Sequence, residues 1–208
     1  MPILDFATLT NTDLQAYFHE GALSHDAGYS NYNLEYTFQN GDHYKQRLED
    51  FFSNEGITGA IDILELGGAW GHRAVYAMTT FPGFKSWEII DIYDSPNRLT
   101  HAKLSYTTGD ARILLNDSKV YKNNDKDITT SFRFLECIPE VDLADLITQM
   151  NRVTKTRQYH IIGTAENADF YSTRDLTWWS TQGFATDTVL ISSKDFQHGD
   201  FSNIVRVA

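Results

Sequence analysis

A glycine-rich turn placed directly after a short apolar run is the feature that most constrains the fold of this chain. The run Ile61–Leu66 is rich in isoleucine and leucine and leads into Glu-Leu-Gly-Gly-Ala-Trp-Gly at 65–71. A helical pattern follows over 72–78, and Phe81-Pro82-Gly83 stops it. The spacing therefore predicts a strand, a tight turn and a helix in that order.

Strand-like and helix-like runs alternate along the rest of the chain. Short apolar runs predict further strands at 86–92, 103–107, 128–134 and 159–164. Before the last of these, apolar residues recur with the 3.6-residue period of a helix, at Leu143, Leu146, Ile147, Met150 and Val153. A further helix is expected near 175–181, and the runs 188–192 and 203–207 predict a closing antiparallel pair. This alternation is typical of an α/β domain with a mostly parallel sheet.

The first part of the chain has a different pattern. Residues 1–56 are interpreted as helices and turns, with an amphipathic helix at 43–52, and the break falls near Gly56 to Gly59. We expect an N-terminal helical extension or lid at 1–56 and one ligand-binding domain at 57–208, because 208 residues suit a single domain.

Charge and composition exclude several classes of protein. The formal net charge is -11, and the 17 Lys and Arg residues are scattered, so nucleic acid is a poor candidate partner. No apolar run is long enough to span a membrane and the first residues lack the pattern of a signal peptide, so we expect a cytoplasmic protein. Cys137 is the one cysteine, and no His or acidic pair has a recognised metal-ligand spacing, so we expect no metal.

The glycine turn also suggests a ligand. Glycines let backbone amides approach a bulky ligand, although an ordinary strand-to-helix turn needs glycine for the same backbone reasons. A dinucleotide fingerprint beginning at Gly67 would need glycine or alanine at His72, so that pattern fails. The pattern E-x-G-x-x-x-G instead resembles the first motif of the class I S-adenosylmethionine-dependent methyltransferases. Residues at this turn that the resemblance assigns to the cofactor are Glu65, Gly67, Gly68, Ala69 and Gly71.

The resemblance continues in register over about residues 60–164. Asp91, at the end of the second expected strand, would bond the ribose hydroxyls, with Asp94 as the competing acid. Gly109-Asp110-Ala111 resembles the motif in which the acid and the next amide, here Asp110 and Ala111, face adenine. Residues 127–139 resemble the fourth strand and its "LEHIP" continuation, which adds Ser131 to the expected cofactor contacts, and 151–155 resemble the "RV-x-K" segment.

The resemblance implies a Rossmann-like class I methyltransferase fold, which has a seven-stranded, mostly parallel sheet, an antiparallel C-terminal hairpin and helices on both faces. It also implies S-adenosylmethionine as cofactor, S-adenosylhomocysteine as product, and in-line transfer of the sulfonium methyl to an acceptor. The family's nucleic-acid amino-methylating members usually carry Asn or Asp, Pro-Pro and an aromatic after the fourth strand, and this chain has 131–134 Ser-Phe-Arg-Phe. A small-molecule acceptor is therefore expected.

Residues of the reaction site are less sharply indicated. Glu136 follows the fourth strand and is the candidate general base, with capping of the next helix as the alternative. Cys137 replaces the histidine of "LEHIP", and the histidine of a later "D-x-x-H" motif is missing after Asp169. Tyr29, Tyr32 and Trp178 are candidates for a lid or an acceptor pocket, with core packing as the alternative.

Two other functions stay open at this point. A module that binds S-adenosylmethionine or a nucleoside without transfer would explain the two missing histidines. A nicotinamide-dependent dehydrogenase shares a similar doubly wound sheet but not the glycine spacing. The sequence does not select between a monomer and a homodimer.

Overall fold

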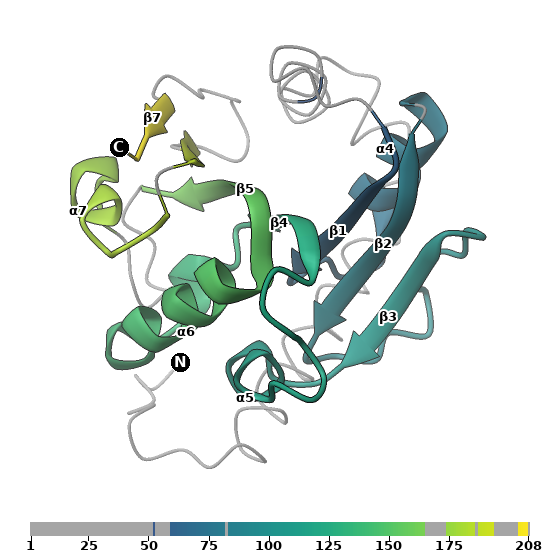
Figure 1. Ribbon diagram of the computed structural model, residues 1–208, viewed down its shortest axis with the longest axis horizontal. Coiled ribbons are helices and arrows are strands. Elements are labelled where there is room, and N and C mark those ends of the chain that lie inside the picture. The colour runs from purple at the N-terminus through teal and green to yellow at the C-terminus, as the bar shows by residue number, and fades with distance from the viewer. Residues whose placement is uncertain are drawn as a thin grey trace.

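The computed structural model describes Phe52 and residues 59–81, 83–164, 174–185, 187–193 and 204–207 (Figure 1). Its strands are β1 (Ile61–Leu66), β2 (Phe84–Asp91), β3 (Leu104–Thr108), β4 (Lys126–Phe132), β5 (Thr154–Gly163), β6 (Thr188–Ser193) and β7 (Ile204–Arg206). Its helices are α4 (His72–Thr80), α5 (Ala111–Asn116), the short 3-10 helix η2 (Leu135–Cys137), α6 (Glu140–Val153) and α7 (Leu176–Ser180).

The strands form one seven-stranded sheet in the order β3-β2-β1-β4-β5-β6-β7. All neighbours from β3 to β6 are parallel, and β7 pairs with β6 in the antiparallel direction. The chain therefore moves from β1 to one side of the sheet for β2 and β3, and to the other side for β4, β5 and β6. The carboxyl ends of these parallel strands lie along one edge, and β1 lies at the point where the strand order reverses.

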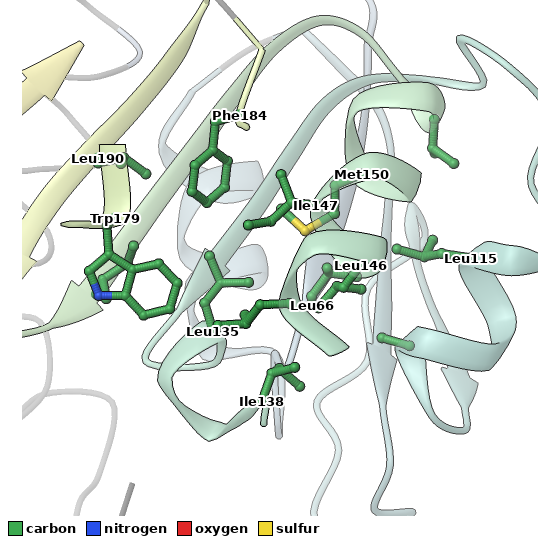
Figure 2. Close-up of a cluster of buried hydrophobic side chains, with 14 of the residues drawn as sticks. Leu66, Leu115, Leu135, Ile138, Leu146, Ile147, Met150, Trp179, Phe184 and Leu190 are labelled. Carbon is green, nitrogen blue, oxygen red and sulfur yellow. The ribbon is translucent and has the colours of Figure 1, made fainter. Parts of the chain in front are cut away.

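Both faces of the sheet are covered. On one face, Ala74 and Ala77 of α4 pack with Phe52 and with strand residues such as Ile63 and Ile89. On the other face, α5, α6 and α7 cover the alternate strand residues, including Leu64, Leu66, Ile90, Ile162 and Leu190 (Figures 1 and 2). Because side chains alternate across a strand, strands buried on both sides must be apolar at nearly every position.

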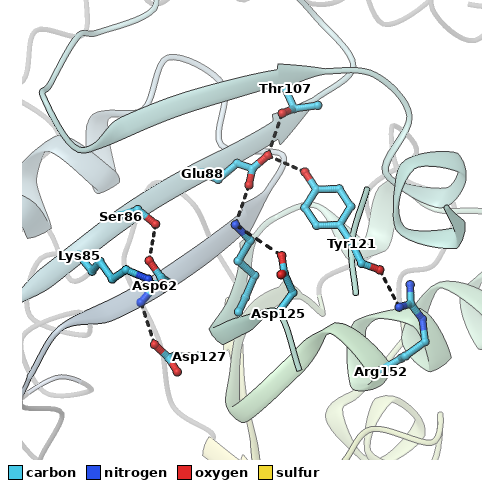
Figure 3. A network of polar contacts seen from close by, with 10 residues as sticks. Asp62, Lys85, Ser86, Glu88, Thr107, Tyr121, Asp125, Asp127 and Arg152 are labelled. Atoms are coloured by element: carbon cyan, nitrogen blue, oxygen red, sulfur yellow. Dashed lines mark hydrogen bonds and ion pairs between the residues drawn. The ribbon is translucent and has the colours of Figure 1, made fainter. Parts of the chain in front are cut away.

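A polar network ties the loop between α5 and β4 to the sheet (Figure 3). Glu88 of β2 accepts hydrogen bonds from the hydroxyls of Tyr121 (2.6 Å) and Thr107 (2.8 Å) and from the ammonium of Lys126 (2.8 Å). Burial raises the pKa of Glu88, but the bonds from Lys126 and Tyr121 outweigh it and hold the pKa below its ordinary value. Arg152 of α6 donates to the backbone oxygen of Tyr121 at 2.7 Å. The loop is thereby held to the sheet through Glu88 and to α6 through Arg152.

The predicted class of fold is confirmed, including the antiparallel C-terminal pair. Strands β2, β3 and β4 are shifted by one or two residues from the predicted bounds, the short helix η2 was not predicted, and two further elements differ. Strand β5 begins at Thr154, directly after α6, whereas the apolar pattern predicted a start at 159. Its first four residues are polar and at least partly exposed, so they carry no apolar signal. Helix α5 follows Asp110, where no helix was predicted; it has 6 residues, too few to show a helical period. The expected helix at 43–52, except Phe52, and the extension at 1–56 lie outside the described residues.

None of the helices in the described ranges is long and apolar enough to cross a membrane. Within the same ranges, no group of three or more His, Cys, Asp or Glu side chains is arranged to hold a metal ion.

The two sides of α6 provide a test of the packing. Leu146 is 1% exposed and Val141 is 83% exposed. Replacing Leu146 with alanine leaves a cavity in the core, so we expect Leu146→Ala to lower the free energy of unfolding by about 2–5 kcal/mol. Val141→Ala is the control on the same helix and should change it by less than about 0.5 kcal/mol. Urea denaturation measures both, and equal effects would contradict the assigned faces of α6.

Candidate functional site

The candidate site lies where β1, β2, β4 and β5 end. Strand β1 is paired with β2 on one side and with β4 on the other. In open α/β sheets, ligands bind outside the carboxyl ends of the strands at such a reversal of strand order. Most of the residues that the sequence analysis assigned to the cofactor are at this edge, on the turn after β1, at the end of β2 and after β3.

The glycines of the turn after β1 are required by the protein's own packing. Gly67 has φ +70°, and a Cβ atom there would lie 2.6 Å from the ring of Phe134. Gly71 has φ +83°, and its Cβ would lie 2.2 Å from the hydroxyl oxygen of Tyr106. A Cβ at Gly68 would lie 2.8 Å from the side chain of Ile89. The glycine pattern is therefore explained by the turn itself and does not by itself demonstrate a ligand.

Glu65 supports the turn from beneath. Its side chain is 2% exposed and accepts hydrogen bonds from Arg73 at 2.8 Å and from the indole nitrogen of Trp87 at 3.1 Å. The carboxylate therefore joins β1 to α4 and β2 on the α4 face of the sheet. These contacts make Glu65 a residue that positions the turn, and a direct contact with a cofactor stays a prediction.

Asp91 joins the end of β2 to the glycine turn. Its Oδ2 accepts a hydrogen bond from the amide of Ala69 at 2.9 Å, and its Oδ1 accepts one from the amide of Tyr93 at 3.0 Å. A carboxylate has about four lone-pair sites, so this one can accept further bonds from two hydroxyl groups. Burial raises the pKa of Asp91, while the two amides and Arg98 act in the opposite direction.

Asp94, the competing acid, has a different environment. Its side chain is 74% exposed and forms an ion pair with Arg98 at 2.5 Å. Arg98 also donates to the hydroxyl of Thr108 at 3.0 Å and to the backbone oxygen of Tyr93 at 2.8 Å. Asp94 thus lies on the surface, and only Asp91 of the two is hydrogen-bonded to the glycine turn.

Asp110 caps helix α5 and is already engaged. Its carboxylate accepts from the amide of Arg112 at 2.9 Å and forms an ion pair with the Arg112 guanidinium at 2.6 Å. Arg112 also pairs with Asp142 of α6 at 2.6 Å. Ala111, the next residue, is buried in the first turn of α5. The expected contact of Asp110 with an adenine amino group stays a prediction, and it requires sharing the carboxylate with Arg112.

Ser131 belongs to a buried polar chain that the sequence analysis missed. Its hydroxyl lies 2.8 Å from Nδ1 of His160, and Nε2 of His160 lies 3.0 Å from Oε1 of Gln158. Gln158 donates through Nε2 to Oδ1 of Asn151 at 2.6 Å, so its Oε1 is free to accept. The chain of bonds therefore assigns the proton of a neutral His160 to Nε2 and makes Nδ1 the acceptor from Ser131. The signal in the sequence was a histidine inside the apolar strand 159–163.

Glu136 is the most deeply buried acid at this edge. It is 0% exposed and lies in η2, just after β4. Its Oε1 accepts hydrogen bonds from Nε of Arg133 and from the amide of Gly163 at 3.0 Å. Its Oε2 has no hydrogen-bond partner among the described residues. Burial raises the pKa of Glu136, although Arg133 and the amide of Gly163 favour the ionised form.

The aromatic candidates are only partly described. Trp178 is half-buried and packs against the core on the α6 face, and the guanidinium of Arg174 lies 5.5 Å from its ring centre. Trp179 is fully buried in the same core. Tyr29 and Tyr32 lie outside the described residues. Contact of Trp178 with an acceptor stays a prediction beside its packing role.

The fold matches solved methyltransferases. One match is the 1,6-didemethyltoxoflavin-N1-methyltransferase of Burkholderia thailandensis, crystallised with 1,6-didemethyltoxoflavin and S-adenosylhomocysteine. Its TM-score is 0.61 at 10% identity, over 86% of this chain and 80% of that one. Another is a SAM-dependent methyltransferase from Archaeoglobus fulgidus, with TM-score 0.52 at 16% identity, over 76% of this chain and 74% of that one.

Other matches are partial. The match to a methyltransferase of an antibiotic biosynthesis pathway from Anabaena variabilis has TM-score 0.44 at 12% identity and covers 71% of this chain but 44% of that one. No protein-family model and no curated protein sequence matches the chain. Likeness at these identities establishes the fold: this is the Rossmann-like fold of the class I S-adenosylmethionine-dependent methyltransferases.

Ala69 provides a test of the turn. It has φ +48°, a left-handed conformation that costs a residue with a Cβ roughly 1–2 kcal/mol. Glycine avoids this cost, but it loses more backbone entropy on folding, which offsets about half of the gain. We expect Ala69→Gly to raise the free energy of unfolding by about 0.5 kcal/mol. Ala144→Gly, on the exposed side of α6, should lower it by about 1 kcal/mol. Thermal and urea unfolding measure both signs; a loss of stability in Ala69→Gly would refute the left-handed turn.

The buried His160 predicts a pH-dependent stability. Burial lowers its pKa from the ordinary 6.5 to about 3, so its neutral form is favoured in the folded state. The contribution of His160 to the free energy of unfolding is fully present above pH 6.5. It is lost as the pH falls towards 3, by at most about 1.4 kcal/mol per pH unit. We expect His160→Gln to remove this dependence between pH 7.5 and 5 and the partly exposed His101→Gln to keep it, as measured by urea unfolding. Identical slopes in the His160→Gln variant and the wild type would contradict the assignment.

Proposed function

We propose that the chain binds S-adenosylmethionine at the carboxyl edge of the sheet and transfers its methyl group to a small-molecule acceptor. The observation that carries the proposal is the Asp91 carboxylate, held against the glycine turn by the amides of Ala69 and Tyr93. Its remaining lone pairs suit the two neighbouring hydroxyls of a ribose. The fold supports the same cofactor, because the structures it matches include a SAM-dependent methyltransferase and a methyltransferase crystallised with S-adenosylhomocysteine.

Few protein groups are needed for this chemistry. The bound cofactor would supply an activated methyl group, so the protein has to orient an acceptor lone pair in line with it and exclude water. Asp91 would hold the ribose, and Glu65 would keep the turn in place through Arg73 and Trp87. Glu136 remains the candidate base for an oxygen acceptor, because its Oε2 is not used by the described residues.

A small acceptor is supported by the overall charge. The net charge of -11 opposes binding to a polyanion. The Burkholderia thailandensis enzyme, which has the same fold, is named for methylation of a small molecule. We therefore propose a small-molecule acceptor and a cytoplasmic location, and leave the identity of the acceptor to a screen.

The cofactor site can be tested by isothermal titration with S-adenosylhomocysteine and S-adenosylmethionine. We expect Asp91→Asn to weaken both by at least about tenfold, because the amide replaces an ionic acceptor of two ribose bonds with a neutral one. Asp94→Asn is the matched control, since it removes the same charge from the surface nearby, and it should bind within about twofold of the wild type. Gly67→Val is a poor probe, because its side chain would collide with Phe134.

The outcomes separate the candidate functions. If the folded wild type bound neither ligand at millimolar concentration, the proposed cofactor would be wrong and only the fold would stand. Binding with no transfer of an isotopically labelled methyl group to any acceptor in a metabolite screen would favour the non-catalytic binding module. Saturable binding of reduced nicotinamide dinucleotide instead would favour the dehydrogenase.

A further inference from the structure

Glu136 leaves one oxygen unsatisfied in the interior. Oε1 is held by Arg133 and by the amide of Gly163, whereas Oε2 has no hydrogen-bond partner in the described part of the chain. The side chain is 0% exposed, so bulk water does not reach it. Buried polar atoms are nearly always paired, and leaving one unpaired is costly, most of all when it carries charge. We therefore expect a group of a bound ligand to be the partner of this oxygen.

The partner can be inferred from where Glu136 lies relative to Asp91. Asp91 ends β2 and Glu136 follows β4, and β1 with its glycine turn lies between these two strands. The glycine turn and η2 are in contact, because Phe134, which directly precedes η2, packs against Gly67: a Cβ atom at Gly67 would lie 2.6 Å from its ring. A ligand whose ribose binds at Asp91 and which crosses the reversal of strand order therefore extends towards the side of Glu136.

We propose that Oε2 of Glu136 is the counter-charge for the sulfonium of S-adenosylmethionine, so that the site prefers the cationic cofactor to its neutral product. This inference rests on the proposed function and deepens it. When the methyl group leaves, the sulfur keeps the electron pair of the broken bond and becomes a neutral thioether, while the acceptor lone pair forms the new bond. This role replaces that of general base, because in an in-line transfer the acceptor lies on the far side of the methyl group from the sulfur, and one oxygen does not reach both. Glu136 itself is unchanged in the step, but its attraction for the ligand is lost.

The expected size follows from the surroundings of Glu136. Opposite charges attract more strongly in a buried site than in water, because the effective dielectric constant is lower there. Arg133 bonds to the other carboxylate oxygen and cancels part of this attraction. We therefore expect a preference of about tenfold, not the several hundredfold of an isolated buried charge.

The experiment compares three ligands by isothermal titration. S-adenosylmethionine carries a sulfonium, sinefungin carries an ammonium near the same position, and S-adenosylhomocysteine is neutral there. In the wild type both cations should bind about tenfold more tightly than S-adenosylhomocysteine. In Glu136→Gln, which keeps an oxygen for the amide of Gly163, the two ratios should fall to about one, with little change for S-adenosylhomocysteine. Glu140→Gln, at the exposed start of α6, is the matched control and should keep the wild-type ratios.

Each result supports or overturns the inference. Unchanged ratios in a folded Glu136→Gln, or an equal loss of all three ligands, would overturn it, because Glu136 would then act elsewhere or on a shared part of the ligand. If the Gln variant does not fold, the wild type decides, since equal or tighter binding of S-adenosylhomocysteine contradicts a counter-charge. In each of these cases the wild type still binds S-adenosylhomocysteine, and Asp91→Asn still weakens that binding, so the proposed function stands. The proposed function itself fails if the wild type binds none of the three ligands.

Discussion

The burial of β1 on both faces, between parallel neighbours, is the constraint on which the rest of the structure depends. Its residues alternate between the core under α4 and the core under α5, α6 and α7, so Ile63 and Leu64 are both fully buried in opposite layers. Parallel pairing to β2 and β4 brings the carboxyl ends of three strands to one edge. The chain must leave β1 through a tight turn, and that turn forms part of the candidate site at the carboxyl edge of the sheet.

Three ionisable groups near the ends of the strands, of which Asp91 is partly exposed and Glu136 and His160 are buried, are held in different ways. Asp91 receives two backbone amides, and Glu136 receives an amide and a guanidinium on one oxygen only. His160 is satisfied on both nitrogens and kept neutral by burial. A fully satisfied group such as His160 holds the core together, whereas groups with unused lone pairs can still bind a ligand. This difference selects Asp91 and Glu136, and not Ser131, as the residues of greatest functional interest.

Much of the fold could be predicted from local pattern. Strand β1 has the predicted bounds, and α4 and α6 appear where the apolar period placed them. The start of β5 was missed because Thr154 to Arg157 are polar and at least partly exposed, although they lie beside β4 in the sheet. Helix α5 was missed because its stability comes from the cap at Asp110 and from packing on α6, and not from a period of its own.

The sequence by itself determined the seven strands and the helices α4, α6 and α7 in their order along the chain, the sharp turn after β1 and the acid at the end of β2, because each depends on residues close together along the chain. Only the tertiary structure decided that Asp94 is a surface acid, that Asp110 is bound to Arg112 and that Glu65 lies under the turn. It also decided that the space a Cβ atom would need at Gly67 and Gly71 is already occupied by Phe134 and Tyr106. These facts depend on contacts between residues distant in sequence, and a linear pattern carries no information on which side chain occupies a given space.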